Sequence, residues 1–261
     1  MSSERTRFEP TQKEGLRIPL DRGGSKMRLQ APIYHLKRQA KRLSRDRGIP
    51  HHQALDQIAA AEGFQSWSHL AAASTERPAA RIMGGLTGGD MVLLAARPGH
   101  GKTLLGLELA IAAARAGRPG FVFTLDYTRR DVLARLADLG IPAAEAGLLT
   151  IDTSDEICAD YIIERLSAAP GAAFALIDYL QLLDQKRANP DLATQIQALK
   201  AHVRATGAIV AAISQIDRQF DLRAAELPGL ADIRLPNPAD LSAFTRACFL
   251  HDGEIRCGPI A

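Results

Sequence analysis

Five short and almost continuously apolar segments divide the last two thirds of this chain, and stretches of helical period separate them. Strands buried on both faces have unbroken apolar sequences, whereas half-exposed strands alternate. The segments are DMVLLAA, GFVFTLD, GLLTID, AAFALID and AIVAAIS, which begin at residues 90, 120, 147, 172 and 208. Repeated strand–helix–strand units give a mainly parallel sheet flanked by helices. The sequence therefore predicts an α/β fold that binds its ligand at the carboxyl ends of the strands.

The segments between these strands carry start and stop signals of helices. TLLGLELAIAAARAG ends at Gly117, and TRRDVLARLADLG has Thr128 as N-cap, Asp131 three residues later and Gly140 at its end. The next two gaps between predicted strands contain further helical segments, ADYIIERLSAAPG and DLATQIQALKAHVRATG. Helices are therefore predicted between the consecutive strands, as parallel pairing requires.

The first apolar segment runs into RPGHGKT and then into a helix, which is the context of a phosphate-binding loop. In such a loop, backbone N–H groups and the helix N-terminus hold phosphates, Lys102 reaches the β and γ oxygens, and Thr103 is a ligand of Mg²⁺. Ala96 stands where the usual pattern has glycine. The predicted nucleotide contacts are Arg97, Pro98, Gly99, His100, Gly101, Lys102, Thr103 and Leu104.

An acid for the metal is expected as well, and AAFALIDYLQLL supplies one. Asp178 ends a buried apolar segment, which places its carboxylate at the edge of the sheet where the loop lies. There it can hold a water molecule bound to Mg²⁺. We therefore predict Thr103 and Asp178 as the metal-linked pair.

Five motifs in order, AARPGHGKT, FTLDYT, ALIDYLQLL, IVAAISQIDR and LPGLADIR, resemble the ATPase domain of the replicative DnaB helicase family, within the RecA-like ATPases. The resemblance covers about residues 84 to 251 and does not reach the N-terminal third. That family also accepts alanine at the position of Ala96. The resemblance implies a RecA-like P-loop ATPase that uses ATP and Mg²⁺, acts on DNA, in particular single-stranded DNA, and forms a homo-oligomer with a ring as one possible form.

The resemblance also implies roles for single residues. Lys102 and Thr103 correspond to the phosphate and magnesium contacts, Asp178 to the metal-linked acid, and Gln215 to the sensor of the γ-phosphate. Asp126 stands where the family has a water-activating glutamate, and its side chain is one methylene shorter. Because a misplacement of roughly 1 Å can cost about 100-fold in rate, Asp126 is either a slow base or a structural acid.

Two further features of the family concern DNA and the neighbouring subunit. In the family, loops after the equivalents of Asp178 and Gln215 contact single-stranded DNA. The resemblance also implies a C-terminal arginine finger, for which Arg256 is a poor match, and Arg246 is expected on a strand surface. The basic residues in the two DNA-contacting loops of this chain are Lys186, Arg187, Arg218 and Arg223.

Basic charge concentrates in the first 50 residues, which hold 13 Lys/Arg and 5 Asp/Glu, although the net charge of the chain is only +3. Residues 1 to 30 show no sustained period and are predicted to be a mobile basic tail. The spacing of apolar residues then predicts a small helical module over 31 to 74, with a third helix capped by Ser66 and Trp67 in its core. STERPAAR is predicted to be a linker, and residues 82 to 261 the ATPase domain.

The first helix of this module carries the densest basic cluster, in LKRQAKRLSRDRG. Such a cluster can neutralise nucleic-acid phosphates, and it can equally be a solvated helix face. The candidate contacts are Lys37, Arg38, Lys41 and Arg42.

The sequence also indicates a compartment. It contains neither an apolar stretch of about 18 residues nor a secretory signal, so a cytoplasmic protein without a membrane span is expected. Cys158, Cys248 and Cys257 form no C-x-x-C pair and are predicted to be free thiols.

Two functions are compatible with these observations. One is an ATP-driven DNA helicase or motor, and the alternative is a slow or non-hydrolysing, nucleotide-gated DNA-binding or regulatory protein. A KaiC-like or recombinase-like ATPase is a third and less favoured option, because the motifs IDYLQLL and ISQIDR fit the helicase family better.

Overall fold

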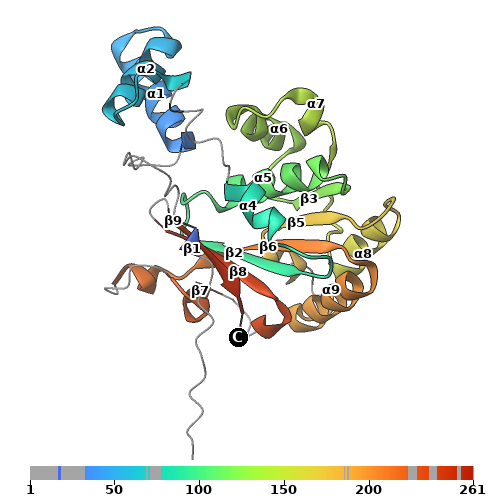
Figure 1. The fold of residues 1–261 in the computed structure, drawn as a ribbon. Coiled ribbons are helices and arrows are strands. Elements are labelled where there is room, and N and C mark those ends of the chain that lie inside the picture. The colour runs from blue at the N-terminus through green and yellow to red at the C-terminus, as the bar shows by residue number, and fades with distance from the viewer. Residues whose placement is uncertain are drawn as a thin grey trace, which may run out of the picture.

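A computed structural model of the chain describes residues 17–18, 33–68, 70, 78–184, 186, 188–222, 228–234, 240–251 and 254–260. At its centre lies a sheet with the strand order β1-β9-β8-β2-β6-β5-β3-β4, and β7 pairs with β6 (Figure 1). The six strands from β8 to β4 pair in parallel, while β1, β7 and β9 pair antiparallel to their neighbours. The predicted α/β fold is confirmed. The strands are β1 (Arg17–Ile18), β2 (Met91–Ala96), β3 (Gly120–Thr124), β4 (Leu149–Asp152), β5 (Phe174–Asp178), β6 (Ile209–Ile216), β7 (Ile233–Arg234), β8 (Arg246–His251) and β9 (Glu254–Pro259).

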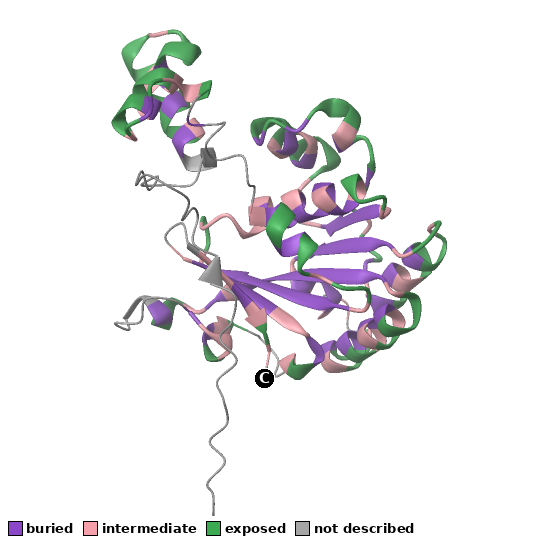
Figure 2. Cartoon of the chain, viewed as in Figure 1, coloured by how far each residue is buried: buried purple, intermediate pink, exposed green. Residues whose placement is uncertain are grey.

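Helices cover both faces of the sheet, and the strands between them are buried (Figure 2). Alternate residues of a strand point to opposite faces, so Leu93 belongs to one core and Leu94 to the other. One face packs against α4 (Pro78–Gly84), α5 (Lys102–Arg115), α6 (Arg129–Asp138) and α7 (Ala143–Ala146). The other packs against α8 (Ala159–Ser167), α9 (Leu192–Thr206) and the 3₁₀ helices η1 (Leu180–Asp184), η2 (Arg218–Leu222), η3 (Leu230–Asp232) and η4 (Leu241–Ala243).

The predicted helix signals act as expected. Thr128 and Asp131 form a capping box at the start of α6, and each side chain accepts a hydrogen bond from the backbone N–H of the other residue. Gly117 and Gly140 have φ values of 79° and 73°, a left-handed conformation that costs glycine little. These local signals therefore set where α5 and α6 end.

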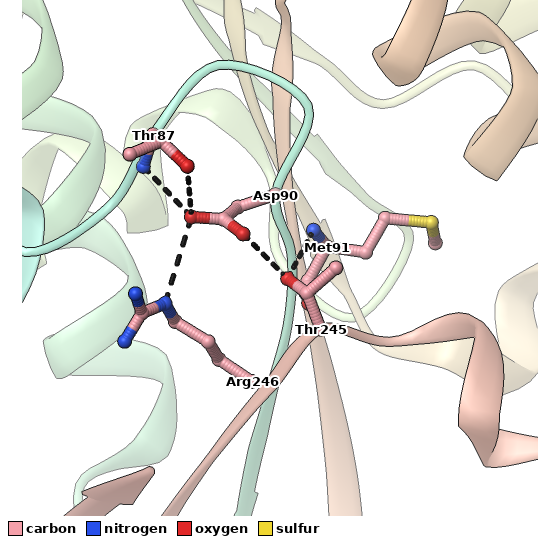
Figure 3. Close-up of polar contacts among 5 residues, drawn as sticks. All are labelled: Thr87, Asp90, Met91, Thr245 and Arg246. Carbon is pink, nitrogen blue, oxygen red and sulfur yellow. Dashed lines mark hydrogen bonds and ion pairs between the residues drawn. The ribbon is translucent and has the colours of Figure 1, made fainter. Parts of the chain in front are cut away.

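A polar network ties the amino-terminal ends of β2 and β8 together (Figure 3). Asp90 accepts hydrogen bonds from the Thr87 N–H at 2.7 Å and the Thr245 hydroxyl at 2.7 Å, and its Oδ2 lies 3.5 Å from Arg246 Nε. Burial raises the pKa of Asp90, but these hydrogen bonds and the charge of Arg246 outweigh it and leave the pKa below its usual value. Arg246, predicted only as a strand-surface residue, is therefore part of a contact between strands.

Two of the three predicted free thiols are paired. Cys248 on β8 lies opposite Cys257 on β9, and the two form a disulfide, while Cys158 is free. The prediction is wrong for these two residues, because a β-hairpin brings together cysteines that no C-x-x-C motif connects. The Asp-Gly pair at 252–253 is a hairpin signal, and the two cysteines stand at equal distances on either side of it.

The N-terminal module contains α1 (Ile33–Arg47) and α2 (His51–Ala61). Its small core consists of Leu36, Ala59, Phe64 and Leu70, with Ile58 and Trp67 packed against it, so Trp67 has the predicted packing role. Residues 67, 68 and 70 are helical where a third helix is predicted, and the rest of that segment lies outside the described residues.

One predicted segment boundary differs from the observed elements. The predicted linker ends inside α4, because Ala79, Ile82 and Met83 are buried in the main core. The predicted mobile tail lies outside the described residues except for Arg17–Ile18, which pair with β9. Within the described part of the chain, no helix is long and apolar enough to cross a membrane.

Candidate nucleotide site

The carboxyl ends of four adjacent strands, β2, β6, β5 and β3, meet at one edge of the sheet. In the register of these strands Gln215 pairs with Ala96, and Asp178 pairs with Thr124. The phosphate loop, the candidate sensor and the candidate metal acid therefore leave the sheet at the same edge, followed by Asp126 two residues beyond β3.

The phosphate loop is shaped by two glycines. Gly99 and Gly101 have φ values of 86° and 87°, which other residues adopt at a cost, and Gly101 is the N-cap of α5. The His100 N–H donates to the Arg97 carbonyl at 3.2 Å and closes the turn between them. The free N–H groups at the start of α5 lie directly after this turn, an arrangement that favours anions.

Lys102 and Asp178 influence each other's ionisation. Burial lowers the pKa of the Lys102 ammonium, and the nearby carboxylates of Asp178 and Asp126 offset part of this effect. Burial raises the pKa of Asp178 to about 6, against the opposing effects of the Thr103 hydrogen bond and the Lys102 charge. The predicted residues Lys102, Thr103, Asp126 and Asp178 thus form one electrostatic group.

The donor set of this group fits Mg²⁺. The Thr103 hydroxyl donates to the Asp178 carboxylate, and both supply the hard oxygen atoms that Mg²⁺ prefers. The described residues contain no group of three or more His, Cys, Asp or Glu side chains that could hold a metal alone. Mg²⁺ is usually held by one or two protein groups, several waters and substrate phosphates.

A second observation concerns Thr124, which neighbours Asp178 across the β3–β5 ladder and points to the same face of the sheet. Its hydroxyl is buried and has no hydrogen-bond partner within the described structure. Buried hydroxyls normally have a hydrogen-bond partner. A water molecule on a bound metal, or the nucleotide itself, can be the partner of this hydroxyl. Thr124 is not among the predicted site residues, although its position two residues before Asp126 in FTLDYT is a sequence signal for it.

Arg135 on α6 was also missed. Its guanidinium lies 3.8 Å from the centroid of the Tyr127 ring, directly after Asp126, and its charge lowers the pKa of Asp178. Asp126 itself is exposed beyond the end of β3. No sequence pattern places Arg135 here, because the contact depends on how α6 packs back on the sheet.

The residues predicted to contact DNA have different surroundings. Lys186 Nζ lies 2.6 Å from Glu156 Oε1 and 3.9 Å from Asp155 Oδ2, whereas Arg218 is exposed on η2. Arg187 and Arg223 lie outside the described residues. Arg256, the poor match for an arginine finger, donates to the Pro228 carbonyl at 3.3 Å.

In the N-terminal module, Lys37 Nζ donates to the Asp138 carbonyl at the end of α6, at 3.2 Å. Arg38, Lys41 and Arg42 are exposed on α1. Contact of these four residues with nucleic acid stays a prediction.

The chain is similar to known proteins of one family. The family described as "DnaB-like helicase C terminal domain" matches residues 78–145 and 141–240, which is more than half of the chain. The replicative DNA helicase DnaB of Leifsonia xyli subsp. xyli is 28% identical over 185 residues, which cover 59% of this chain and 40% of that protein. The replicative DNA helicase DnaB of Geobacillus stearothermophilus is 25% identical over 201 residues, which cover 63% of this chain and 44% of that protein. The chain thus spans less than half the length of these relatives.

Solved structures show the same fold. One of them, described as an ATPase domain, superposes with a TM-score of 0.54 at 25% identity and covers 64% of this chain and 70% of that one. A second structure, described as a DnaB-like replicative helicase and its interactions with primase, gives a TM-score of 0.53 at 20% identity. The match covers 83% of this chain and 65% of that one. The predicted RecA-like P-loop fold is confirmed. The chain belongs to the family of DnaB-like helicase C-terminal domains.

Proposed function

We propose that this protein binds ATP with Mg²⁺ at the phosphate loop, hydrolyses it, and couples the reaction to movement on single-stranded DNA as a homo-oligomer. The observation that supports this most directly is the group of Lys102, Thr103 and Asp178 at the N-terminus of α5, where the Thr103 hydroxyl donates to a buried carboxylate. Membership of the helicase family supports the coupling to DNA.

The binding roles follow from the chemistry of each group. The N–H groups at the start of α5 and the Lys102 ammonium bind the phosphates of ATP. Thr103 and Asp178 hold Mg²⁺ and its water, and the metal, when bound, neutralises phosphate charge. The Gln215 amide, beside the loop in the β2–β6 register, can donate to the γ-phosphate and accept from a water molecule.

The chemical step is in-line attack of water on the γ-phosphorus. The bond from phosphorus to the bridging oxygen of ADP breaks, and the water proton passes to a carboxylate, for which Asp126 is the candidate base. Lys102 stabilises the charge that develops on the phosphate oxygens. Arg135 holds the ring of Tyr127, next to Asp126, and so limits the movement of this segment.

The residues proposed to contact DNA differ in how accessible their charged groups are. Arg218 on η2 is exposed and follows the β6 strand that carries Gln215, so it can respond to the nucleotide. Lys186 is engaged by Glu156, so its contact with DNA requires that this ion pair open. On α1, Arg38, Lys41 and Arg42 are spaced along one exposed face and can add contacts to phosphates.

The test is ATP turnover with and without single-stranded DNA. We expect DNA to stimulate turnover in the wild type, and Lys102→Ala to lower turnover by about 100-fold or more, because it removes a charge from the transition state. Lys200→Ala is the matched control, since Lys200 lies on α9 away from the loop and bonds only weakly to the Ser242 carbonyl, at 3.4 Å.

Two results would contradict the proposal in different ways. If purified wild-type protein binds no ATP, the assignment of the nucleotide site fails. Tight ATP binding with negligible turnover, with or without DNA, would instead favour the nucleotide-gated DNA-binding alternative.

A further inference from the structure

Three aromatic rings from three separate segments lie in series beside the phosphate loop. His100, at the tip of the loop, stacks on His251 at the end of β8, with ring centroids 5.3 Å apart and planes 6° apart. Phe220 on η2 meets His251 edge-on, at 5.2 Å and 86°. The ring of His251 therefore contacts both the phosphate loop and the segment that follows Gln215.

The sheet topology explains why these rings meet. β8 and β6 are the two neighbours of β2, and Leu250 on β8 is in register with Ala96, the last residue before the loop. His251 is one residue further along and so reaches the level of the loop. Phe220 is 2% exposed and belongs to a core cluster, so its ring is held in place from behind.

The loop has particular need of such a contact. His100 stands between Gly99 and Gly101, which have no side chains and the freest backbones in the loop. His100 is thus the residue of the loop tip whose side chain can be held by another element. At the base of the loop, the Arg97 guanidinium donates to the Ile216 carbonyl at 3.3 Å, a separate link to the end of β6.

We propose that His251 is a positioning residue for the phosphate loop, and that through Phe220 it couples the conformation of the loop to η2. The inference rests on the proposed function in two respects: that the loop binds ATP phosphates and that η2 faces DNA. A loop that is already ordered loses less conformational freedom when phosphates bind. A ring that contacts both segments also makes the ordering of one favour the ordering of the other.

The first experiment needs no ligand. Amide hydrogen exchange is measured for peptides covering residues 97–101 and 217–222 in the wild type, His251→Ala and His251→Phe. We expect faster exchange of both peptides in His251→Ala and near wild-type exchange in His251→Phe, which keeps a flat ring. Phe220→Leu, which keeps apolar volume but removes the ring, should loosen the same two segments, with a smaller effect on the loop.

The second experiment measures the dissociation constant of Mg·ATP by calorimetry, and KM and kcat of turnover. Because aromatic pairs typically contribute a factor of about two to ten, His251→Ala should weaken ATP binding and raise KM by about that factor, while kcat without DNA changes less. ATP binding should protect residues 217–222 from exchange in the wild type and in His251→Phe, but not in His251→Ala.

The outcomes separate the two proposals. Unchanged exchange in ligand-free His251→Ala, or an equal defect in His251→Phe, overturns the role of the ring, whether or not the wild type binds ATP. Failure of the wild type to bind ATP overturns the proposed function, and the ligand-free exchange then still decides whether His251 holds the loop. Far-UV circular dichroism of each variant controls for loss of the fold.

Discussion

At the end of β5, the Asp178 carboxyl is 4% exposed, and its burial raises the pKa to about 6. The folded protein therefore binds this proton more tightly than the unfolded chain, whose pKa is near 3.8. Since a shift of one unit corresponds to about 1.4 kcal/mol, ionisation of Asp178 costs the folded state about 3 kcal/mol. The free energy of unfolding falls as the pH rises from about 4 to about 6, and the cost is fully present above that range.

Asp178→Asn should therefore stabilise the ligand-free protein and abolish Mg²⁺-dependent ATP binding. We expect the gain in the free energy of unfolding to be about 1 to 2 kcal/mol larger at pH 8 than at pH 5, as measured by urea unfolding. Asp160→Asn, at an exposed carboxylate on α8, is the control. A variant that is less stable than wild type at both pH values would contradict the cost assigned to Asp178.

Asp126→Glu tests whether the short carboxylate limits catalysis. The added methylene moves the carboxylate by roughly 1 Å, so we expect turnover at saturating ATP to rise by about 10-fold to 100-fold, with little change in KM. Steady-state kinetics measures both quantities, and Asp160→Glu on α8 provides the matched control. If turnover is unchanged or falls, the short carboxylate of Asp126 does not limit catalysis.

Among the elements, the β8–β9 hairpin carries the one covalent cross-link seen in the described structure, between Cys248 and Cys257. The two cysteines are nine residues apart, and closing a loop of this length stabilises a fold by about 2 to 3 kcal/mol. The cross-linked hairpin lies beside β2, the strand that leads into the phosphate loop.

Reduction should lower the free energy of unfolding by about that amount. We expect a reductant to shift the urea midpoint of the wild type and of Cys158→Ser, but not that of Cys257→Ser. Mass measurement after alkylation without reductant counts the free thiols. Three alkylated cysteines in the native protein would show that the pair is open in solution.

For the whole molecule, the arrangement around the site bears on assembly. Besides Lys102 itself, the cations that act on Lys102 or Asp178 in the described chain are Arg97 and Arg135, and the Arg97 guanidinium already donates to a carbonyl. In some nucleotide hydrolases a further arginine that stabilises the transferred phosphate comes from another protein chain. Such a residue favours an assembly in which nucleotide lies between subunits.

We therefore expect Mg·ATP to increase the molar mass of the wild-type protein in light-scattering measurements, and to leave Lys102→Ala unchanged, because that variant binds ATP weakly. Lys200→Ala should assemble like the wild type. A monomer that persists with ATP bound, over a range of protein concentrations, would contradict assembly through nucleotide.

How much of this protein could be predicted depends on the range of the interactions involved. The strands, the capping box of Thr128 and Asp131, the phosphate loop and the position of Asp178 were predictable, because apolar period, caps and motif spacing are local properties of the chain. The α4 helix was missed because its sequence, with Pro78 at its start, was interpreted as a linker. The orphan hydroxyl of Thr124 needed the β3–β5 register to become visible.

By itself, then, the sequence predicted the alternation of the main strands and helices and the loop of the candidate nucleotide site, since both depend on residues that are near one another in the chain. Only the tertiary structure decided which distant side chains meet: Arg135 with Tyr127, Lys186 with Glu156, Cys248 with Cys257, and His251 with both His100 and Phe220. These contacts arise from strand order and helix packing, which bring together groups that no local pattern connects.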